Sequence, residues 1–262
     1  MTDHLFTPEN LVSRLKSMKE RGEKIAALTA YDYPMAKLLD EAGVDILLVG
    51  DSLGMVVLGY PDTTSVTIED MVHHTSAAAR AKPHALLTAD MPYRSYDTPS
   101  EALTNAQKLI AAGAQAIKME GGIEILPQIE TIRSAGIQVI GHLGMLPQHI
   151  LEEGGKYHIK GKMEEEQQQL IQSAVALEKA GVAAIVLELI KHDFTTQITR
   201  SIQIPTIGIA SGPDCDGQIL VIHDLIGAFP WFIPKFITPV LKTGADTRQA
   251  AADWIQKLKK NK

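Results

Sequence analysis

The junction EAGVDILLVGD, at Glu41–Asp51, decides the fold of this 262-residue chain. In it a helix-like stretch ends at Ala-Gly and is followed directly by a short apolar run. The pattern returns in AAGAQAIKME at Ala111–Glu120, SAGIQVIGH at Ser134–His142 and KAGVAAIVLE at Lys179–Glu188. A glycine at this place favours the left-handed conformation that ends a helix. Nearly continuous apolar runs are typical of parallel strands buried on both faces. The junctions therefore predict a repeated helix–strand unit.

Other short apolar runs fit the same alternation. The remaining expected strands are Ile25–Ala30, Ala85–Ala89, Pro205–Ile209 and Trp231–Lys235. Expected helices include Val66–Arg80, Met163–Lys179 and one that begins at Thr98–Pro99. About eight strands alternating with helices predict an α/β protein with a (β/α)8 TIM barrel, as a single domain over residues 1–262. An open doubly wound sheet is the alternative, but no G-x-G-x-x-G string follows the first strand.

Composition excludes several classes of protein. The formal net charge is −6, whereas nucleic-acid-binding domains are usually basic. The single cysteine, Cys215, excludes an intrachain disulfide and a cysteine-based zinc site. No apolar run approaches the roughly 18 residues of a membrane span, and residues 1–24 contain no apolar signal core. We expect a cytoplasmic protein with no nucleic-acid or membrane partner.

Polar residues stand where the expected strands end. They are Asp51, Asp90, Lys118, Glu120, His142 and Glu188. In a barrel these positions meet at the carboxyl-terminal rim, where active sites lie. Lys118 and Glu120 are two residues apart on one strand, so their side chains point the same way.

These residue types together indicate a particular chemistry. Carboxylates with room for water suit Mg²⁺, a lysine can hold a substrate carboxylate, and a further carboxylate can act as a general base. One metal ion can chelate an α-keto acid and stabilise its enolate. Each acidic residue alone could instead cap a helix, and His142 could be a hydrogen-bonded barrel residue. Six polar residues on successive strand ends favour an active site.

Seven strings occur in order along the chain and carry a resemblance. They are TAYD (Thr29–Asp32), VGDSLG (Val49–Gly54), ADMPY (Ala89–Tyr93), IKMEGG (Ile117–Gly122), GHLGMLPQ (Gly141–Gln148), VLE (Val186–Glu188) and DGQILVIHD (Asp216–Asp224). Together they resemble the ketopantoate hydroxymethyltransferase family, whose reaction is that of a 3-methyl-2-oxobutanoate hydroxymethyltransferase. The resemblance runs from about Lys24 to Lys235.

The resemblance implies a (β/α)8 barrel of the phosphoenolpyruvate/pyruvate type and dependence on Mg²⁺. It implies transfer of a hydroxymethyl group from 5,10-methylenetetrahydrofolate to 3-methyl-2-oxobutanoate, which gives 2-dehydropantoate in pantothenate biosynthesis. It also implies a large homo-oligomer, such as a decamer.

The motifs imply roles for particular residues. By VGDSLG, Asp51 is similar to a metal ligand that also binds substrate, and Ser52 to a substrate contact. By ADMP, Asp90 is similar to a second metal ligand that contacts substrate. By IKMEGG, Lys118 matches a substrate-binding lysine and Glu120 a carboxylate of the metal site.

Two further roles and one departure follow from the same resemblance. Glu188 matches the proton acceptor of the reaction, and His142 a histidine of the substrate-binding wall. The family usually reads I-G-I-G-A-G after its seventh strand, whereas Ile207–Gly212 reads I-G-I-A-S-G. Ala210 and Ser211 are therefore expected to alter that loop.

Two rival interpretations remain open at the level of sequence. One is an Mg²⁺-dependent lyase or decarboxylase that acts on an α-keto acid with the same carboxylates, and a requirement for folate separates it from a transferase. The other is a non-catalytic barrel, which would not bind Mg²⁺. The presence of all the acidic residues together with Lys118 disfavours the second.

Overall fold

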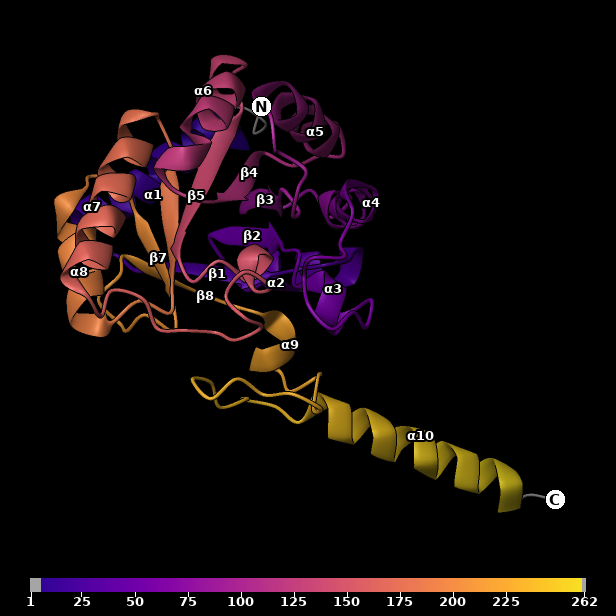
Figure 1. The fold of residues 1–262 in the computed structure, drawn as a ribbon. Helices are drawn as coiled ribbons and strands as arrows, with labels where there is room; N and C mark the ends of the chain where they lie inside the picture. Colours follow the sequence, from indigo (N-terminus) through magenta and orange to yellow (C-terminus); the bar gives the residue numbers. More distant parts are fainter. Residues whose placement is uncertain (1–5, 261–262) are drawn as a thin grey trace. The chain divides into compact units, whose positions relative to one another are not determined.

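The computed structural model describes residues 6–260. Within these residues eight strands close into a barrel, and consecutive strands pair in parallel from the first to the last (Figure 1). The strands are β1 (Ile25–Thr29), β2 (Ile46–Val49), β3 (Leu86–Asp90), β4 (Ala116–Glu120), β5 (Gln138–Gly144), β6 (Ala184–Glu188), β7 (Thr206–Ile209) and β8 (Gly217–Leu220). The predicted barrel is therefore confirmed.

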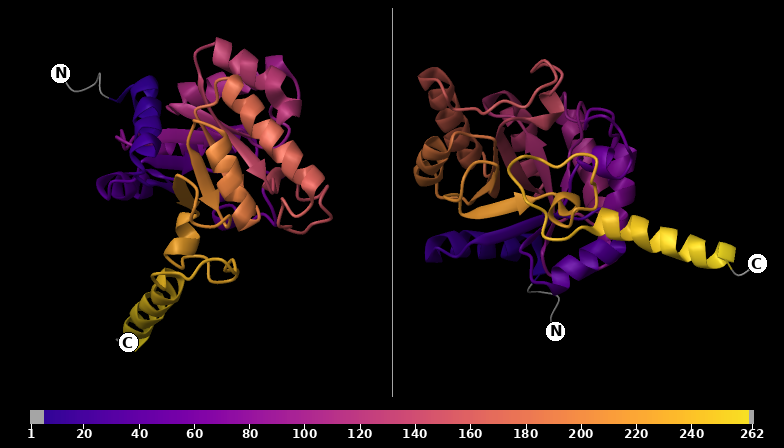
Figure 2. Two further views of the ribbon diagram at one scale, coloured as in Figure 1. Left: turned by 90° about the vertical axis from the view of Figure 1, so that its left-hand side faces the viewer. Right: turned by 90° about the horizontal axis from the view of Figure 1, so that it is seen from below.

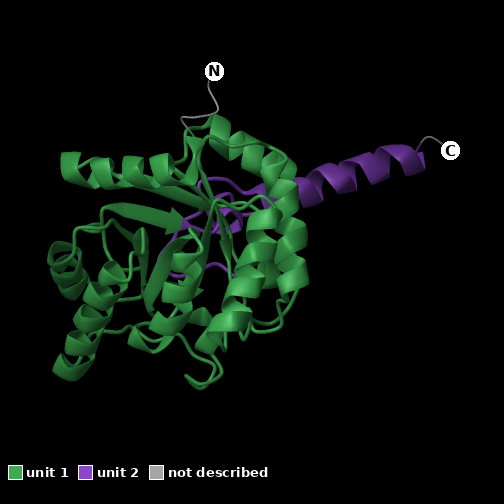
Figure 3. Ribbon diagram, turned by 90° about the horizontal axis from the view of Figure 1, so that it is seen from above, with its two compact units in different colours: residues 1–219 green, residues 220–262 purple. Residues whose placement is uncertain are grey.

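Helices alternate with these strands and surround them (Figure 3). They are α1 (Pro8–Arg21), α2 (Tyr33–Glu41), α3 (Leu53–Val56), α4 (Ile68–Ala79), α5 (Pro99–Ala111), α6 (Leu126–Ser134), α7 (Glu164–Lys179) and α8 (His192–Ser201), with the short 3-10 helices η2 (Ile123–Ile125) and η3 (Pro147–His149). In the part of the chain that the structure describes, no helix is long and apolar enough to cross a membrane.

The glycines of the four helix–strand junctions have the backbone conformation that the sequence predicts. Gly43, Gly113, Gly136 and Gly181 have φ angles of +89°, +109°, +79° and +83°. A residue with a Cβ is strained in this region, whereas glycine is not. Each junction can therefore end its helix and turn the chain directly into the next buried strand.

The amino-terminal end of the barrel is closed by α1. Leu11, Leu15 and Met18 of this helix are buried in one cluster with residues near the starts of the strands, among them Ile25 and Ile46. Nζ of Lys19 also donates hydrogen bonds at 2.9–3.1 Å to three backbone oxygens. They belong to Thr199, near the end of α8, and to Ile202 and Ile204, which follow that helix. Apolar side chains therefore fill the interior of the barrel at this end.

The chain divides into two compact units, residues 1–219 and residues 220–262 (Figure 3). The first holds the barrel, apart from the last residue of β8. The second contains α9 (Ile222–Leu225) and α10 (Thr243–Lys260), and α10 is one continuous helix (Figure 2). The expectation of a single domain over residues 1–262 stays a prediction.

The expected strand at Trp231–Lys235 is wrong. This segment has no strand conformation, and its side chains are largely exposed, with Trp231 at 77%. The eighth strand is Gly217–Leu220, which pairs with β7. The expected strand was unfavourable because Pro234 cannot donate a hydrogen bond to a sheet. The actual strand was missed because β8 is short and Gln218 interrupts the apolar pattern that a buried strand usually has.

Candidate active site

The polar residues predicted at the strand ends converge at the carboxyl-terminal end of the barrel. The parallel register places Asp90 beside Lys118, and Glu120 beside His142. These four side chains and that of Asp51, which follows β2, are almost completely buried, at 1–5% exposure. Glu188, at the end of β6, is partly exposed. The barrel thus brings together residues that are up to 137 positions apart in the chain, from Asp51 to Glu188.

One ammonium group, that of Lys118, contacts two acidic residues, and a third is bonded to the first of these. The backbone N–H of Asp51 donates to Oδ2 of Asp90 at 3.1 Å. Nζ of Lys118 lies 2.5 Å from Oδ1 of Asp90 and 3.7 Å from Oε1 of Glu120. Burial lowers the pKa of Lys118, but the negative charges of Asp90, Glu120 and Asp51 outweigh it and raise the pKa above its ordinary value. Lys118 is therefore a permanent cation at neutral pH.

His142 lies between two further carboxylates. Its Nδ1 is 3.3 Å from Oε1 of Glu120, and its Nε2 is 3.4 Å from Oε2 of Glu188. Both distances are long for hydrogen bonds, so these contacts are chiefly between charges. Burial lowers the pKa of His142, but the charge of Glu120 and the contacts with both carboxylates raise it to about 9. His142 thus belongs to the charged cluster and connects Glu188 to it.

The acidic side chains carry more charge than the two cations balance. Burial, followed by the negative charges of Asp90 and Glu120, raises the pKa of Asp51 well above its usual range. Burial also raises the pKa of Asp90. Burial opposes ionisation of Glu120 as well, but its pKa is lowered because His142 and Lys118 stabilise the charged form. An added cation beside Asp51 would relieve this repulsion.

The donor set fits a magnesium ion in one particular way. Within residues 6–260, no group of three or more His, Cys, Asp or Glu side chains that could hold a metal ion is formed, and Lys118 contacts both Asp90 and Glu120. Mg²⁺ is commonly held by one or two carboxylates, with water and substrate as the other ligands. Buried, mutually repelling carboxylate oxygens suit that arrangement. The metal roles of Asp51, Asp90 and Glu120 stay predictions.

Ser52 lies beside this cluster at the start of α3. Its Oγ is 2.8 Å from the hydroxyl of Tyr31. A Cβ on Gly50 would come within 2.9 Å of Ser52 Oγ and 3.4 Å of Asp90 Oδ2. A side chain at position 50 would therefore push against the Ser52 hydroxyl, which glycine avoids. This close approach places Ser52 near the carboxylates, as a substrate contact requires.

Sequence reasoning missed Gln148 and Tyr96. Gln148 is 1% exposed, and its Nε2 donates to Oδ2 of Asp51 at 2.8 Å. The hydroxyl of Tyr96 lies 2.7 Å from Oε1 of Gln148 and 3.1 Å from the backbone oxygen of Glu120. Burial raises the pKa of Tyr96 well above its usual range, so the hydroxyl stays a donor. The GHLGMLPQ string includes Gln148, but nothing in the string shows which way its side chain turns.

The departure at Ala210–Ser211 has a structural consequence next to Glu188. The hydroxyl of Ser211 accepts a hydrogen bond from the N–H of Ile190 at 3.0 Å and donates to the carbonyl of Leu187 at 2.8 Å. Ala210 has φ of +51°, where glycine is favoured. Ser211 therefore joins the backbone on both sides of Glu188, while Ala210 introduces local strain.

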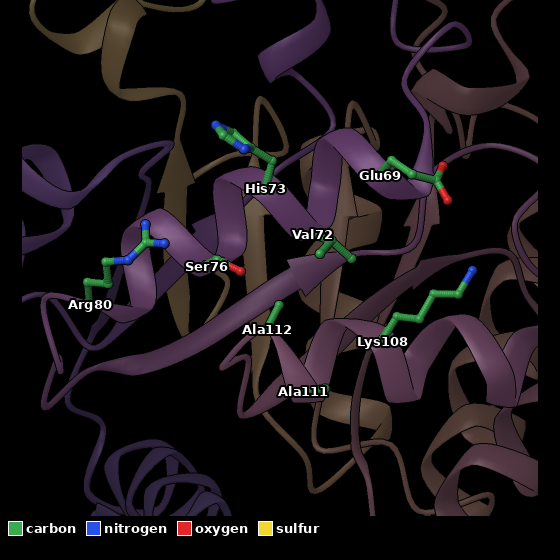
Figure 4. A pocket seen from close by; sticks show the side chains of 8 residues that line it. All are labelled: Glu69, Val72, His73, Ser76, Arg80, Lys108, Ala111 and Ala112. Carbon is green, nitrogen blue, oxygen red and sulfur yellow. The ribbon is translucent and has the colours of Figure 1, made fainter.

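A surface groove lies elsewhere on the barrel, between α4 and α5. It is lined by Glu69, His73 and Arg80 on the α4 side and by Lys108 of α5, among others (Figure 4). The predicted site residues do not contribute to it. The groove is therefore separate from the charged cluster.

A closed (β/α)8 barrel with a buried lysine among carboxylates at the carboxyl ends of its strands defines an enzyme of the TIM-barrel class. The sequence model of the ketopantoate hydroxymethyltransferase family matches residues 9–262. The chain belongs to this family and is therefore a hydroxymethyltransferase.

Curated relatives agree over most of the chain. A protein of Ignicoccus hospitalis named 3-methyl-2-oxobutanoate hydroxymethyltransferase is 50% identical over 241 residues, which covers 92% of this chain and 91% of the relative. A protein of Moorella thermoacetica with the same name is 47% identical over 251 residues, with 95% and 93% covered.

Solved structures share the fold at much lower identity. A phosphonopyruvate hydrolase in complex with oxalate and Mg²⁺ has a TM-score of 0.64 at 18% identity, with 93% of this chain and 98% of that chain covered. A 2,3-dimethylmalate lyase of the PEP mutase/isocitrate lyase superfamily has a TM-score of 0.60 at 18% identity, with 95% and 87% covered. These likenesses confirm the expected (β/α)8 fold.

Proposed function

We propose that this enzyme transfers a hydroxymethyl group from 5,10-methylenetetrahydrofolate to 3-methyl-2-oxobutanoate and forms 2-dehydropantoate, a step of pantothenate biosynthesis. The observation that carries the proposal is one continuous set of contacts. It runs from Asp51 through Asp90, Lys118, Glu120 and His142 to Glu188. Such a set can bind an anionic keto acid at one end and remove its proton at the other.

Asp51, Asp90 and Glu120 would hold Mg²⁺. They supply hard oxygen ligands. Burial and the neighbouring carboxylates raise the pKa of Asp51, so a cation beside it would stabilise its ionised form. When bound, the ion would polarise the ketone of the substrate and stabilise the charge of its enolate.

Lys118 would orient the carboxylate of the keto acid. An ammonium group has three N–H donors, and in this structure Asp90 and Glu120 face two of them. The third can donate to a substrate carboxylate. Because Lys118 points from β4 in the same direction as Glu120, a substrate held by Lys118 would also lie beside the carboxylates.

Glu188 would accept the proton from carbon 3 of the keto acid, which is adjacent to the ketone. Its contact with His142 at 3.4 Å holds one carboxylate oxygen toward the cluster. His142, as a buried cation, attracts this carboxylate and fixes its orientation. The enolate carbon would then bond to the methylene carbon that the folate delivers. Both C–N bonds between that carbon and the folate break, water supplies the hydroxyl oxygen, and tetrahydrofolate leaves with the protons on its two nitrogens. Ser52 would contact the substrate beside Asp51.

The cellular compartment, oligomeric state and partners of the enzyme are also part of this proposal. We expect it to act in the cytoplasm, as a homo-oligomer such as a decamer, on small-molecule keto acid and folate, with no nucleic-acid or membrane partner. The net charge of −6 supports the absence of a nucleic-acid partner.

The test is an assay in which each component is left out in turn. We expect 2-dehydropantoate to form only when 3-methyl-2-oxobutanoate, 5,10-methylenetetrahydrofolate and Mg²⁺ are all present. Cleavage or decarboxylation of the keto acid without folate would instead indicate a lyase. No turnover and no calorimetric Mg²⁺ binding would indicate a barrel without this activity.

A further inference from the structure

Gln148 makes contact with two of the carboxylates at once. It lies in η3, the short turn that follows β5. Its backbone N–H donates to Oε2 of Glu120 at 3.1 Å, and its side-chain Nε2 donates to Oδ2 of Asp51 at 2.8 Å. Nε2 also donates to the backbone oxygen of Met91 at 2.8 Å. Both amide hydrogens of the side chain are therefore used.

The orientation of the Gln148 amide is determined by its neighbours. The Asp51 carboxylate and the Met91 carbonyl are acceptors, so the amide nitrogen must face them. The Tyr96 hydroxyl, which lies 2.7 Å away, is a donor to the amide oxygen. A flipped amide would place its oxygen against two acceptors. The two acceptors therefore select the orientation in which Gln148 donates to Asp51, and the Tyr96 hydroxyl stabilises it by donating to the amide oxygen.

We infer that Gln148, oriented by Tyr96, is a positioning residue that holds the carboxylates of Asp51 and Glu120 in place for a divalent cation. The inference rests on the proposed function, which assigns these two carboxylates to Mg²⁺. The bonds from Gln148 use one oxygen of each carboxylate, Oδ2 of Asp51 and Oε2 of Glu120. Asp51 keeps Oδ1 for the cation, whereas Oε1 of Glu120 faces Lys118 at 3.7 Å and His142 at 3.3 Å, so Glu120 would act at the edge of the metal site.

A neutral amide suits this task better than a charged group. A cation in place of the amide would repel Mg²⁺, and an anion would add to the repulsion that already raises the pKa of Asp51. Gln148 also connects β5 to β2 and β4 through the ends of the strands. The two acidic residues can then keep one geometry despite their mutual repulsion.

Calorimetric titration with Mg²⁺ alone tests the inference without requiring turnover. Gln148→Met keeps the length of the side chain but removes both amide donors. We expect it to weaken Mg²⁺ binding by roughly 10- to 100-fold, the usual effect of losing a group that orients a metal ligand. Tyr96→Phe removes one hydroxyl, and we expect it to weaken binding by roughly fivefold, the effect of one neutral hydrogen bond.

Gln138→Met is the matched control. Gln138 is a buried glutamine at the opposite end of β5, where its Oε1 accepts from Arg133 at 2.8 Å. We expect this variant to lose stability on heating but to keep wild-type Mg²⁺ affinity. A merely structural role of Gln148 would give the same result as the control.

Two outcomes overturn the inference in distinguishable ways. Wild-type Mg²⁺ affinity in a folded Gln148→Met protein, with weakened binding in Asp51→Asn, would contradict the role of Gln148 and leave the proposed function intact. Unchanged affinity in Asp51→Asn as well would remove the metal assignment and the inference with it. If Gln148→Met does not fold, unchanged affinity in Tyr96→Phe decides against the inference.

Discussion

Nζ of Lys118 lies 2.5 Å from Oδ1 of Asp90, and both side chains are almost completely buried. A buried charge is costly unless it is paired, and removal of one partner leaves the other uncompensated. The pair therefore has two consequences. It keeps Lys118 charged for an anionic ligand, and it favours the ionised form of Asp90 against the burial that raises the pKa of that carboxyl.

Lys118→Met should raise the KM for 3-methyl-2-oxobutanoate while the KM for the folate changes little. The side chain keeps its length but loses the charge-assisted hydrogen bond to the substrate carboxylate, so the expected increase is roughly 10- to 100-fold. Steady-state kinetics with each substrate varied in turn measure both constants. Equal increases in the two KM values would point to a general structural role.

Asp51→Asn and Asp90→Asn should each weaken Mg²⁺ binding because each removes one hard anionic ligand. The loss should reach at least the roughly 10- to 100-fold that changes around metal ligands typically produce. Asp45→Asn is the control, since Asp45 precedes the amino end of β2 and pairs with Arg14 at 3.1 Å. Calorimetry should find wild-type affinity there, and unchanged affinity in both site variants would refute the assignment.

Glu188→Gln should abolish exchange of the carbon 3 proton of the keto acid with D₂O. Deprotonation does not require folate, so the wild-type enzyme should exchange this proton with Mg²⁺ and keto acid alone. The variant keeps the shape of the side chain but cannot accept a proton, and the expected loss is roughly 10²- to 10⁴-fold. Proton NMR follows the exchange. Exchange at the wild-type rate would identify another group as the base, with His142 the next to test.

The metal-free protein should lose stability in alkaline solution through His142. Its pKa is raised from 6.5 to about 9, so the stabilisation is complete below pH 6.5 and is lost as the pH rises through 9. The shift corresponds to an upper limit on the order of 3 kcal/mol. Urea unfolding of metal-free protein between pH 6 and 10 measures it. His142→Gln should remove this part of the pH dependence, and an identical profile in the variant would contradict the assignment.

Ser211→Ala should lower the free energy of unfolding by about 1–3 kcal/mol, because the buried N–H of Ile190 loses its acceptor. Ser134→Ala is the control. The hydroxyl of Ser134 donates to the carbonyl of Glu130 on the exposed side of α6, and we expect a change within about 0.5 kcal/mol there. Denaturant unfolding compares the two. An effect of Ser211→Ala as small as that of the control would show that water replaces the hydroxyl.

The order of strands was predictable because a repeated local pattern carries it. The glycine junctions specify where a helix ends and a buried strand begins, and parallel connectivity then places Asp90 next to Lys118. The wrong prediction of a strand at Trp231–Lys235 also came from relying on a local pattern. An apolar run indicates burial only when a partner covers it, and the residues that close the barrel, Gly217–Leu220, are too few and too polar to stand out.

The sequence by itself determined that the chain forms a (β/α)8 barrel and that Asp51, Asp90, Lys118, Glu120, His142 and Glu188 meet at one end of it. Strand periodicity and parallel topology are local and regular, so both can be inferred from spacing. Only the tertiary structure decided which atoms touch. The position of Gln148 against Asp51, the orienting hydroxyl of Tyr96 and the pKa of His142 each depend on side chains from separate loops and strands. Burial and charge at such a site are sums over residues distant in sequence, and they exist only once the barrel has closed.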